Sequence, residues 1–389
     1  MLATSEMMTP PSAGRLLSLV RSGVASTRAD LARLTGLSGT TVTQRVDDLI
    51  SAGYLRDAGE GSSRGGRRPR LIAIDPNGGV VAAVDIGATG TTIGILDLAS
   101  GILARDVVRV DLTAGPQRSL EIIAEHARVL AERAAAGPLL GFGVGLPGPV
   151  DSRSHRLVTP SQLPGWDGVD VAALLSASAG LPVIVDNDAD IMALGEAVSD
   201  AEPVESLVFV KVDASIGCGV IANGRLYRGT TGFAGDISHV TVPEAPDVAC
   251  SCGRRRCLDA ISGGSALVAA MAAAGIEVTM HELVELGRQG HPQATTLLRQ
   301  AGMRTGTVLA TIVNFFNPRQ LVLGGAISEA DAFVAGVRAA VYAECLPMIS
   351  AEVDIVSSAA GPDAGLLGAA RIILDHVFDE DRIDAEVTG

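Results

Sequence analysis

The chain lacks any long apolar run. Its apolar runs have the length of a strand, as at residues 207–210, and none approaches the roughly 20 residues that span a bilayer. The first residues, MLATSEMMTPPSAGR, lack the cationic start and apolar core of a signal peptide. Five cysteines are too few for a disulfide scaffold. These absences predict a soluble cytoplasmic protein and argue against a membrane-bound or secreted one.

Lysine is almost absent as well. Lys211 is the single lysine among 30 basic residues, a usage that we attribute to genomic base composition. The net charge is −14, but residues 1–75 hold 10 arginines against 7 acidic residues, a balance of +3, so the remainder carries −17. A mildly basic head on an acidic body predicts that any nucleic-acid contact belongs to the head.

The sequence of residues 1–75 predicts a helix-turn-helix. The stretch STRADLARLTGLSGTTVTQRVDDLISAGYL predicts two helices with Gly36 between them and Ser38 as the N-cap of the second. An apolar stripe on the second helix follows helical spacing, whereas its first turns carry short polar groups that a recognition helix presents to the major groove. The predicted DNA-contacting residues of this helix are Thr40, Thr41, Gln44 and Arg45. The alternative is a generic helical pair with a solvated polar face.

The stretch YLRDAGEGSSRGGRRPRLIAI then predicts a two-stranded wing. Its arginines Arg64, Arg67 and Arg68 are candidates for phosphate or minor-groove contact. A disordered basic linker is the other interpretation.

From Val80 the pattern changes to alternating strands and helices. VVAAVDIGATGTTIGILDL and LVFVKVDASIGCGVIANGRLYRG both predict a strand, a glycine loop and a second strand, the latter closed by an Asn223-Gly224 turn. The repeat predicts an internal duplication, hence two similar lobes with a cleft between them.

Seven motifs in order resemble the ROK family of repressors, open reading frames and sugar kinases, and the leading winged helix resembles its branch of xylose, N-acetylglucosamine and Mlc-type repressors. The motifs are DIGATGTT, GLPGPVD, DNDADIMALGE, GCGVIANGRLYRG, AGDISH, CSCGRRRCLD and LVLGG. The resemblance implies an α/β fold: a winged helix-turn-helix followed by an actin-like, ribonuclease-H-type body that binds a sugar. We expect the winged helix at 1–75, a first lobe at 76–186 joined by the C-terminal helix at about 364–389, and a second lobe at 187–363.

Three cysteines and a histidine predict a metal site. Three thiolates and one imidazole form a closed tetrahedral zinc site of the structural type, and the family's zinc knuckle has its ligands at the matching positions. These are His239, Cys250, Cys252 and Cys257. Three buried cysteines without a metal are the alternative. Arg256 stands where the family has glycine, which predicts a strained turn.

The sugar site is expected at the exposed end of a buried strand, in VDNDAD. Asn187 and Asp188 supply an amide and a charged acceptor for hydroxyls, and Asp188 holds the position of the general base in the family's kinases. A turn whose asparagine caps the next helix is an alternative that can hold simultaneously. The resemblance adds Asp236, His239 and Asp259, where aspartate at 236 and 259 replaces the family's glutamate. These shorter acids predict an altered choice of sugar.

Phosphate chemistry is predicted to be lost. Asp85, Gly87 and Thr89 match a kinase pattern in which the aspartate helps hold Mg²⁺, and Gly217 and Gly219 match part of the second phosphate loop. That loop reads Asp213-Ala214-Ser215 where kinases have Gly-Thr-Gly. Ser215 is unfavourable if a positive φ is needed, and Asp213 repels a triphosphate if it faces one.

The sequence therefore predicts a sugar-responsive DNA-binding regulator, most simply a repressor, with operator DNA and a sugar as partners, a homodimeric or tetrameric state, structural zinc, and no ATP or Mg²⁺. An active sugar kinase with a DNA-binding head is one alternative. A constitutive DNA-binding scaffold with a vestigial body is another.

Overall fold

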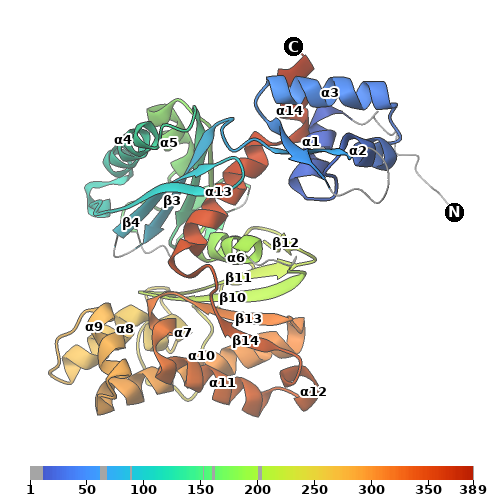
Figure 1. Cartoon of the computed structure of the whole chain (residues 1–389). Helices are drawn as coiled ribbons and strands as arrows, with labels where there is room; N and C mark the ends of the chain where they lie inside the picture. The colour runs from blue at the N-terminus through green and yellow to red at the C-terminus, as the bar shows by residue number, and fades with distance from the viewer. Residues whose placement is uncertain are drawn as a thin grey trace.

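The computed structural model describes residues 12–61, 68–87, 90–151, 153–159, 163–199 and 204–388. Two five-stranded sheets form the body, and a small winged domain packs beside the first (Figure 1). In the described chain no helix is long and apolar enough to cross a bilayer.

The winged domain has three helices and a two-stranded antiparallel sheet. Its elements are α1 (Ala13–Arg21), α2 (Arg28–Thr35), α3 (Gly39–Ser51), β1 (Leu55–Glu60) and β2 (Arg70–Ile74). Thr27 caps α2 by accepting the N–H of Asp30, and Ser38 caps α3 by accepting that of Thr41. Gly36 ends α2 in the left-handed region at φ +72°. The predicted turn chemistry of the helix-turn-helix is confirmed.

Both body sheets have the same topology. In the first, the order is β5-β4-β3-β6-β9, and in the second it is β12-β11-β10-β13-β14. Each begins with three antiparallel strands and then adds two strands parallel to the first strand. The repeated strand–loop–strand pattern thus corresponds to two copies of one sheet topology, and the predicted α/β fold is confirmed.

The first sheet is formed by β3 (Val80–Gly87), β4 (Gly90–Asp97), β5 (Ile102–Val108), β6 (Leu139–Leu146) and β9 (Val183–Asn187). Alternate residues of β3 enter different cores: Val80 and Val84 pack with α4 (Pro116–Ala134) and α5 (Val171–Ala179), whereas Val81 and Ala83 pack with α13 (Ala364–Val377). Burial on both faces explains why residues 80–84 of β3 are all apolar. Trp166, the only tryptophan, is fully buried in the α4–α5 core and donates from Nε1 to Leu112 O at 3.0 Å.

The second sheet is formed by β10 (Ser206–Val212), β11 (Ile216–Ala222), β12 (Arg225–Leu226), β13 (Gln320–Gly324) and β14 (Asp354–Ser357). Asn223 and Gly224 have φ of +52° and +70°, as the predicted β11–β12 turn requires. The helices on its outer side are α7 (Leu258–Ser262), α8 (Gly264–Ala273), α9 (Met280–Arg288), α10 (Pro292–Phe316), α11 (Asp331–Glu344) and α12 (Pro347–Ser350).

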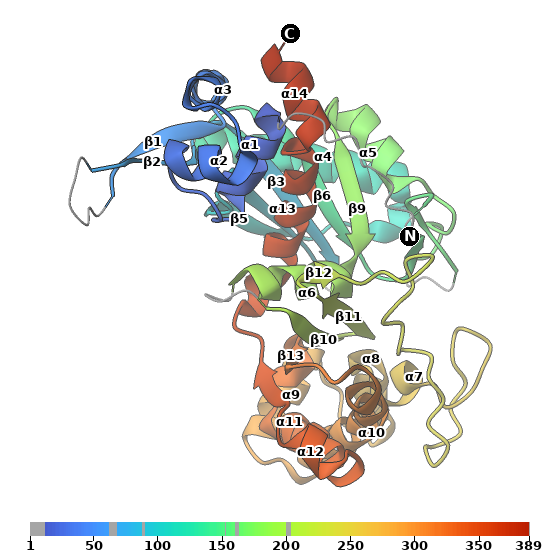
Figure 2. The same cartoon turned by 90° about the vertical axis from the view of Figure 1, so that its right-hand side faces the viewer.

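Two helices join the sheets at the centre of the body. α6 (Asp188–Ser199) follows β9 and lies between the sheets, where it packs along α13 (Figure 2). Glycines allow this close approach, because a Cβ at Gly195 or Gly368 would collide with the backbone of the other helix. α6 and α13 thus form one tightly packed pair between the two sheets.

The C-terminal segment is two helices rather than one continuous helix. After α13 the chain turns at Phe378 and continues as α14 (Glu380–Thr388), which packs on α1 of the winged domain. Gly14 N donates to Asp384 Oδ1 at 2.9 Å, and Arg21 forms a 2.7 Å ion pair with Asp375. Where the three predicted segments begin and end stays a prediction.

Candidate functional sites

The DNA-reading surface expected on α3 is partly exposed. Thr40 and Gln44 are exposed, Thr41 is half-buried beside Ser38, and the buried stripe Val42, Val46 and Leu49 faces the domain core. Arg45 differs from the expectation of an outward side chain. It is half-buried, and its Nη1 has no hydrogen-bond partner within the described ranges.

The wing arginines are described only in part. Arg64 and Arg67 lie outside the described residues, whereas Arg68 is 68% exposed and lies 3.9 Å from Glu60. A loosely paired, exposed guanidinium is available to a phosphate. Whether any of these arginines contacts DNA stays a prediction.

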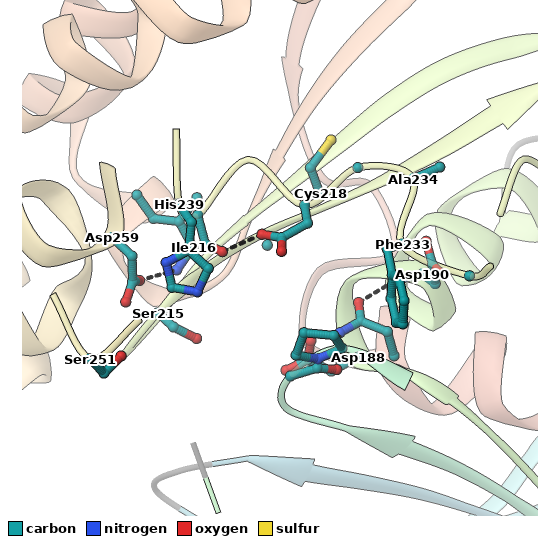
Figure 3. Close-up of a pocket in the computed structure, with 18 residues that line it drawn as sticks. Asp188, Asp190, Ser215, Ile216, Cys218, Phe233, Ala234, His239, Ser251 and Asp259 are labelled. Atoms are coloured by element: carbon teal, nitrogen blue, oxygen red, sulfur yellow. Dashed lines mark hydrogen bonds between the residues drawn. The ribbon is translucent and has the colours of Figure 1, made fainter. Parts of the chain in front are cut away.

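A first cavity contains every residue that the sequence predicts for sugar binding (Figure 3). It lies between the two sheets, bounded by the loop after β6, the start of α6, the β10–β11 turn and the segment 232–239. The predicted residues that line it are Asn187, Asp188, Asp236, His239 and Asp259. Gly148 contributes to the wall, as expected of the GLPGPVD loop.

Asn187 and Asp188 are held firmly at the start of α6. Asn187 Nδ2 donates to Gly148 O at 2.8 Å, and its Oδ1 accepts the N–H of Ala189 at 2.9 Å. Asp188 is 4% exposed, accepts the same N–H through Oδ1, and pairs with Lys211 through Oδ2. The helix-capping interpretation of Asn187 is therefore realised, and it coexists with a place in the cavity.

The two shorter acids occupy different environments. Asp259 Oδ1 accepts the N–H of Ile216 at 2.8 Å, which fixes the β10–β11 turn, and burial raises the pKa of its carboxyl above the usual value. Asp236 is exposed at the rim of the cavity, where it accepts a hydrogen bond from the Ser238 hydroxyl. Asp236 is thus the more available acceptor for a ligand.

The predicted metal ligands gather in one cluster. One ligand atom from each of His239, Cys250, Cys252 and Cys257 lies within 4.8 Å of the others. Cys252 Sγ and Cys257 Sγ are 3.6 Å apart, close to the about 3.8 Å expected between two sulfurs bound tetrahedrally to zinc at 2.3 Å. The donor set and spacing fit a closed four-coordinate metal ion. Arg256, between these ligands, has φ +60°, so the predicted strained turn is present.

His239 belongs to both the cluster and the first cavity. Its Nδ1 lies 3.5 Å from Cys250 Sγ, while the residue lines the cavity. A metal-bound Nδ1 leaves Nε2 as the hydrogen-bonding atom. The cysteine loop can therefore position one wall of the cavity.

A second cavity lies on the other side of Asp188 and Lys211. It is lined by Asp85 and Gly87 at the end of β3, by Lys211 and Asp213, by the diglycine turn 324–325, and by residues 357–358. Thr89 lies outside the described residues. The predicted phosphate glycines Gly217 and Gly219 do not line this cavity; they lie in β11, where a Cβ would press on Ala189 of α6 at 2.8 and 2.6 Å. Their role in the fold is close packing of β11 on α6.

The loop Asp213-Ala214-Ser215, which replaces the Gly-Thr-Gly of the kinases, agrees only in part with the expectations from the sequence. Ser215 is not among the described residues with a positive φ, so the strain considered for it does not arise. Asp213 directs its carboxylate to the backbone, where Oδ1 accepts the N–H of Ala326 at 2.7 Å, just after the diglycine turn. Backbone N–H groups at glycine turns commonly bind anions. Here the N–H of Ala326 is already hydrogen-bonded to the Asp213 carboxylate, so it is not available to a phosphate.

Sequence reasoning missed three charged residues, of which Lys211 and Asp190 line the cavities. Lys211 is buried beside Asp188, and Arg228 donates twice to Asp186 Oδ2, at 2.9 and 2.5 Å. Asp190 lines the first cavity, is 2% exposed, and its Oδ1 has no hydrogen-bond partner within the described chain. A lone lysine inside an otherwise apolar strand was the one signal in the sequence that pointed to any of them.

Comparison with known proteins supports this geometry. The xylose repressor of Bacillus subtilis (strain 168) is 28% identical over 356 residues, covering 90% of this chain and 92% of the repressor. The crystal structure of a ROK hexokinase from Thermus thermophilus is 32% identical, with a TM-score of 0.62 over 78% of this chain and 99% of the hexokinase. A ROK transcriptional regulator described as a homologue of Escherichia coli MLC shares the fold over 97% of this chain and 98% of its own, with a TM-score of 0.78 and 23% identity.

Two family descriptions match separate parts of the sequence. Residues 14–56 match winged helix-turn-helix DNA-binding domains, which agrees with α1–α3 and the start of β1. Residues 81–376 match the ROK family, a span that includes both sheets, both cavities and the cysteine cluster. The chain therefore belongs to the ROK family.

Proposed function

We propose that this chain is a sugar-responsive transcriptional repressor. The observation that carries the proposal is the presence, in one chain, of a winged helix-turn-helix and a two-sheet body whose first cavity gathers Asn187, Asp188, Asp236 and Asp259. Carboxylate and amide groups of this kind bind the hydroxyls of a sugar. Two relatives named as xylose repressors align with 90% of this chain and over 92% of their own length.

The finer assignments belong to the same proposal. Thr40, Thr41, Gln44 and Arg45, with Arg64, Arg67 and Arg68, contact operator DNA. Asn187, Asp188, Asp236, His239 and Asp259 contact the sugar, and zinc occupies the His239 and cysteine cluster as a structural ion. The working unit is a homodimer, because paired recognition helices read two half-sites.

The proposed signal travels through the central helices. A sugar that draws the lobes together moves α6, which packs on α13, and the chain continues from α13 into α14 against α1. A shift of α14 would change the spacing of two recognition helices and weaken operator binding, provided the sugar binds the closed form more tightly. Identical dimers with and without inducer in solution scattering would contradict this route.

The direct test is a thermal-shift screen of sugars and sugar phosphates, followed by operator release with any hit, measured by fluorescence anisotropy. Asp236→Asn is expected to weaken the hit's binding by about tenfold or more, since it removes a charged acceptor. Asp354→Asn, an exposed acid at the far edge of the second sheet, is the matched control. Operator binding that no metabolite shifts would instead favour a constitutive DNA-binding scaffold.

A sugar kinase is the second candidate, because Asp85 and Gly87, which match the kinase pattern, line the second cavity, and Asp188 pairs with Lys211 beside it. We propose that phosphoryl transfer has been lost, since Asp213 takes a backbone donor at that cavity and Lys211 engages Asp188. A coupled assay of ATP consumption over the same sugars distinguishes the two. Robust turnover would establish the kinase.

A further inference from the structure

The only lysine of the chain is buried at the boundary of the two cavities. Lys211 lies in β10 between Val210 and Val212, its side chain is 9% exposed, and Nζ pairs with Asp188 Oδ2. An ammonium group removed from water is costly unless charged partners surround it. The surrounding groups should therefore explain why a lysine stands in this strand.

Three carboxyl groups from three different elements lie near this ammonium. Nζ pairs with Asp188, which begins α6, and Lys211 lines the second cavity together with Asp85, near the end of β3, and Asp213, which follows β10. Burial opposes the charge on Lys211, but the attraction of Asp188, Asp213 and Asp85 outweighs it and raises the pKa of the lysine above its usual value. One positive charge thus lies among carboxyl groups from both lobes.

Asp213 also has a second partner. Its carboxylate accepts the backbone N–H of Ala326, while its own carbonyl accepts the N–H of Gly264 at 2.7 Å. The loop is therefore fixed to the turn after β13 on one side and to the start of α8 on the other. The carboxylate occupies a backbone donor of the kind that binds a phosphate oxygen.

We propose that Lys211 is an internal replacement for a divalent cation. Its ammonium pairs with Asp188 beside the cavity that Asp85 and Asp213 line, and together with Asp213 on the Ala326 N–H it prevents metal–nucleotide complexes from binding in the second cavity. The same ammonium keeps Asp188 oriented at the edge of the first cavity. Lys211 is thus a positioning residue for ligand binding that needs neither metal nor nucleotide. Only this last step depends on the proposed function.

The proposal has a consequence for the chain without this amine. Lys211→Ala leaves Asp85, Asp188 and Asp213 without the ammonium that now lies near all three carboxyl groups. Oxygen ligands of this number and charge are those that bind Mg²⁺ or Mn²⁺, and the number of charged ligands changes cation affinity by orders of magnitude. The substitution should therefore create a divalent cation site.

Titration of the full-length chain with Mn²⁺, followed by the electron paramagnetic resonance signal of the free ion, tests this directly. We expect Lys211→Ala to bind one more Mn²⁺ than the wild type, and Mg²⁺ to compete for it. Lys211→Arg keeps the positive charge and should bind no extra ion. Lys211→Ala combined with Asp85→Asn removes one of the carboxylates and should lose most of the gain.

Two results would overturn the proposal. One is a folded Lys211→Ala chain, judged by circular dichroism, that binds Mn²⁺ no better than the wild type; the other is extra binding that survives Asp85→Asn unchanged. If Lys211→Ala unfolds without added metal, its thermal midpoint in millimolar Mn²⁺ becomes the readout. A rise absent from the wild type is expected, and no folded state in either condition also contradicts the proposal. Because neither sugar nor DNA is used, this test fails or succeeds separately from the proposed function.

Discussion

Tyr54 Oη donates a 2.8 Å hydrogen bond to Glu386 Oε2, which ties the residue before the wing to the last helix described. The contact does not stand alone. The Tyr54 ring meets Phe378 edge-on with centroids 6.1 Å apart, and the Arg21 guanidinium lies 4.8 Å from the centre of the same Phe378 ring. The winged domain is thereby attached to the body through side chains of α13 and α14 and of the turn between them.

Tyr54→Phe should loosen this attachment. Removing the hydroxyl deletes one hydrogen bond to a carboxylate and is expected to destabilise the docked α14 by about 1 kcal/mol. Hydrogen exchange of the α14 amides measures the effect locally, and urea unfolding measures it globally. Tyr342→Phe, on an exposed tyrosine of α11, is the control. Equal exchange of α14 in both variants would show that the Tyr54 hydroxyl does not hold the helix.

The cysteine cluster should contain one tightly bound zinc ion per chain. Cys252→Ser is expected to lose the metal and to lower the thermal midpoint, because a tetrahedral structural site needs all four ligands. Metal content by mass spectrometry and thermal unfolding give the two readouts. Cys345→Ser replaces a buried cysteine far from the cluster, whose Sγ contacts Ala310 O at 3.6 Å, and should keep the zinc. Full metal content in Cys252→Ser would exclude the predicted ligand set.

Asp85 should make folding stability depend on pH. Burial raises the pKa of its carboxyl from 3.8 to about 7. Between these two values the folded state keeps a proton that the unfolded state has released, so the free energy of unfolding should fall as pH rises through this range. Asp85→Asn removes that contribution. Its stability should therefore decline less between pH 5 and pH 7 than that of the wild type.

Denaturant unfolding at several pH values checks the Asp85 prediction. Asp354→Asn, at an exposed carboxylate of β14, should retain the wild-type slope. A slope in Asp85→Asn equal to that of the wild type would assign the pH dependence to other groups, such as Asp190, whose pKa burial also raises.

Gln44 is exposed on α3, where its Nε2 donates to Asp48 Oδ1 at 2.9 Å, and its amide can form a bidentate contact with a base. Gln44→Ala should weaken binding to a DNA duplex selected in vitro against the wild-type chain by about 1–3 kcal/mol, the usual value of a bidentate base contact. Anisotropy titrations at several salt concentrations measure it, and the salt slope should stay unchanged because no phosphate contact is lost. Gln117→Ala, on α4 of the body, is the matched control. If Gln44→Ala binds DNA as tightly as the wild type, the bases are contacted by other residues of α3.

Much of the fold could be predicted from short-range sequence patterns. Several features depend only on residues that are neighbours in the sequence. They are the caps of α2 and α3 by Thr27 and Ser38, the left-handed Gly36, and the Asn223-Gly224 turn. The repeated strand–loop–strand pattern predicted two lobes because each lobe has the same sheet order. The metal cluster could be predicted as well, because three of its four ligands lie within eight residues of sequence.

The directions of side chains, and the contacts between residues far apart in the sequence, could not be predicted in this way. Nothing near Asp213 in the sequence indicates that its carboxylate reaches Ala326, 113 residues later. The partnership of Lys211 with Asp188 depends on β10 lying beside α6, and the break between α13 and α14 depends on the winged domain against which α14 packs. The sequence likewise does not show that Gly217 and Gly219 lie against Ala189 of α6, and their role in phosphate binding stays a prediction.

The hydrogen bond between Gly14 N and Asp384 Oδ1 spans 370 positions of the chain. The buried cluster that holds Leu16, Leu17, Val42 and Val46 also contains Phe378 and Ile383. Part of the core of the winged domain is therefore supplied by the last segment of the described chain. A chain that ended before α14 would expose that face of the domain to water.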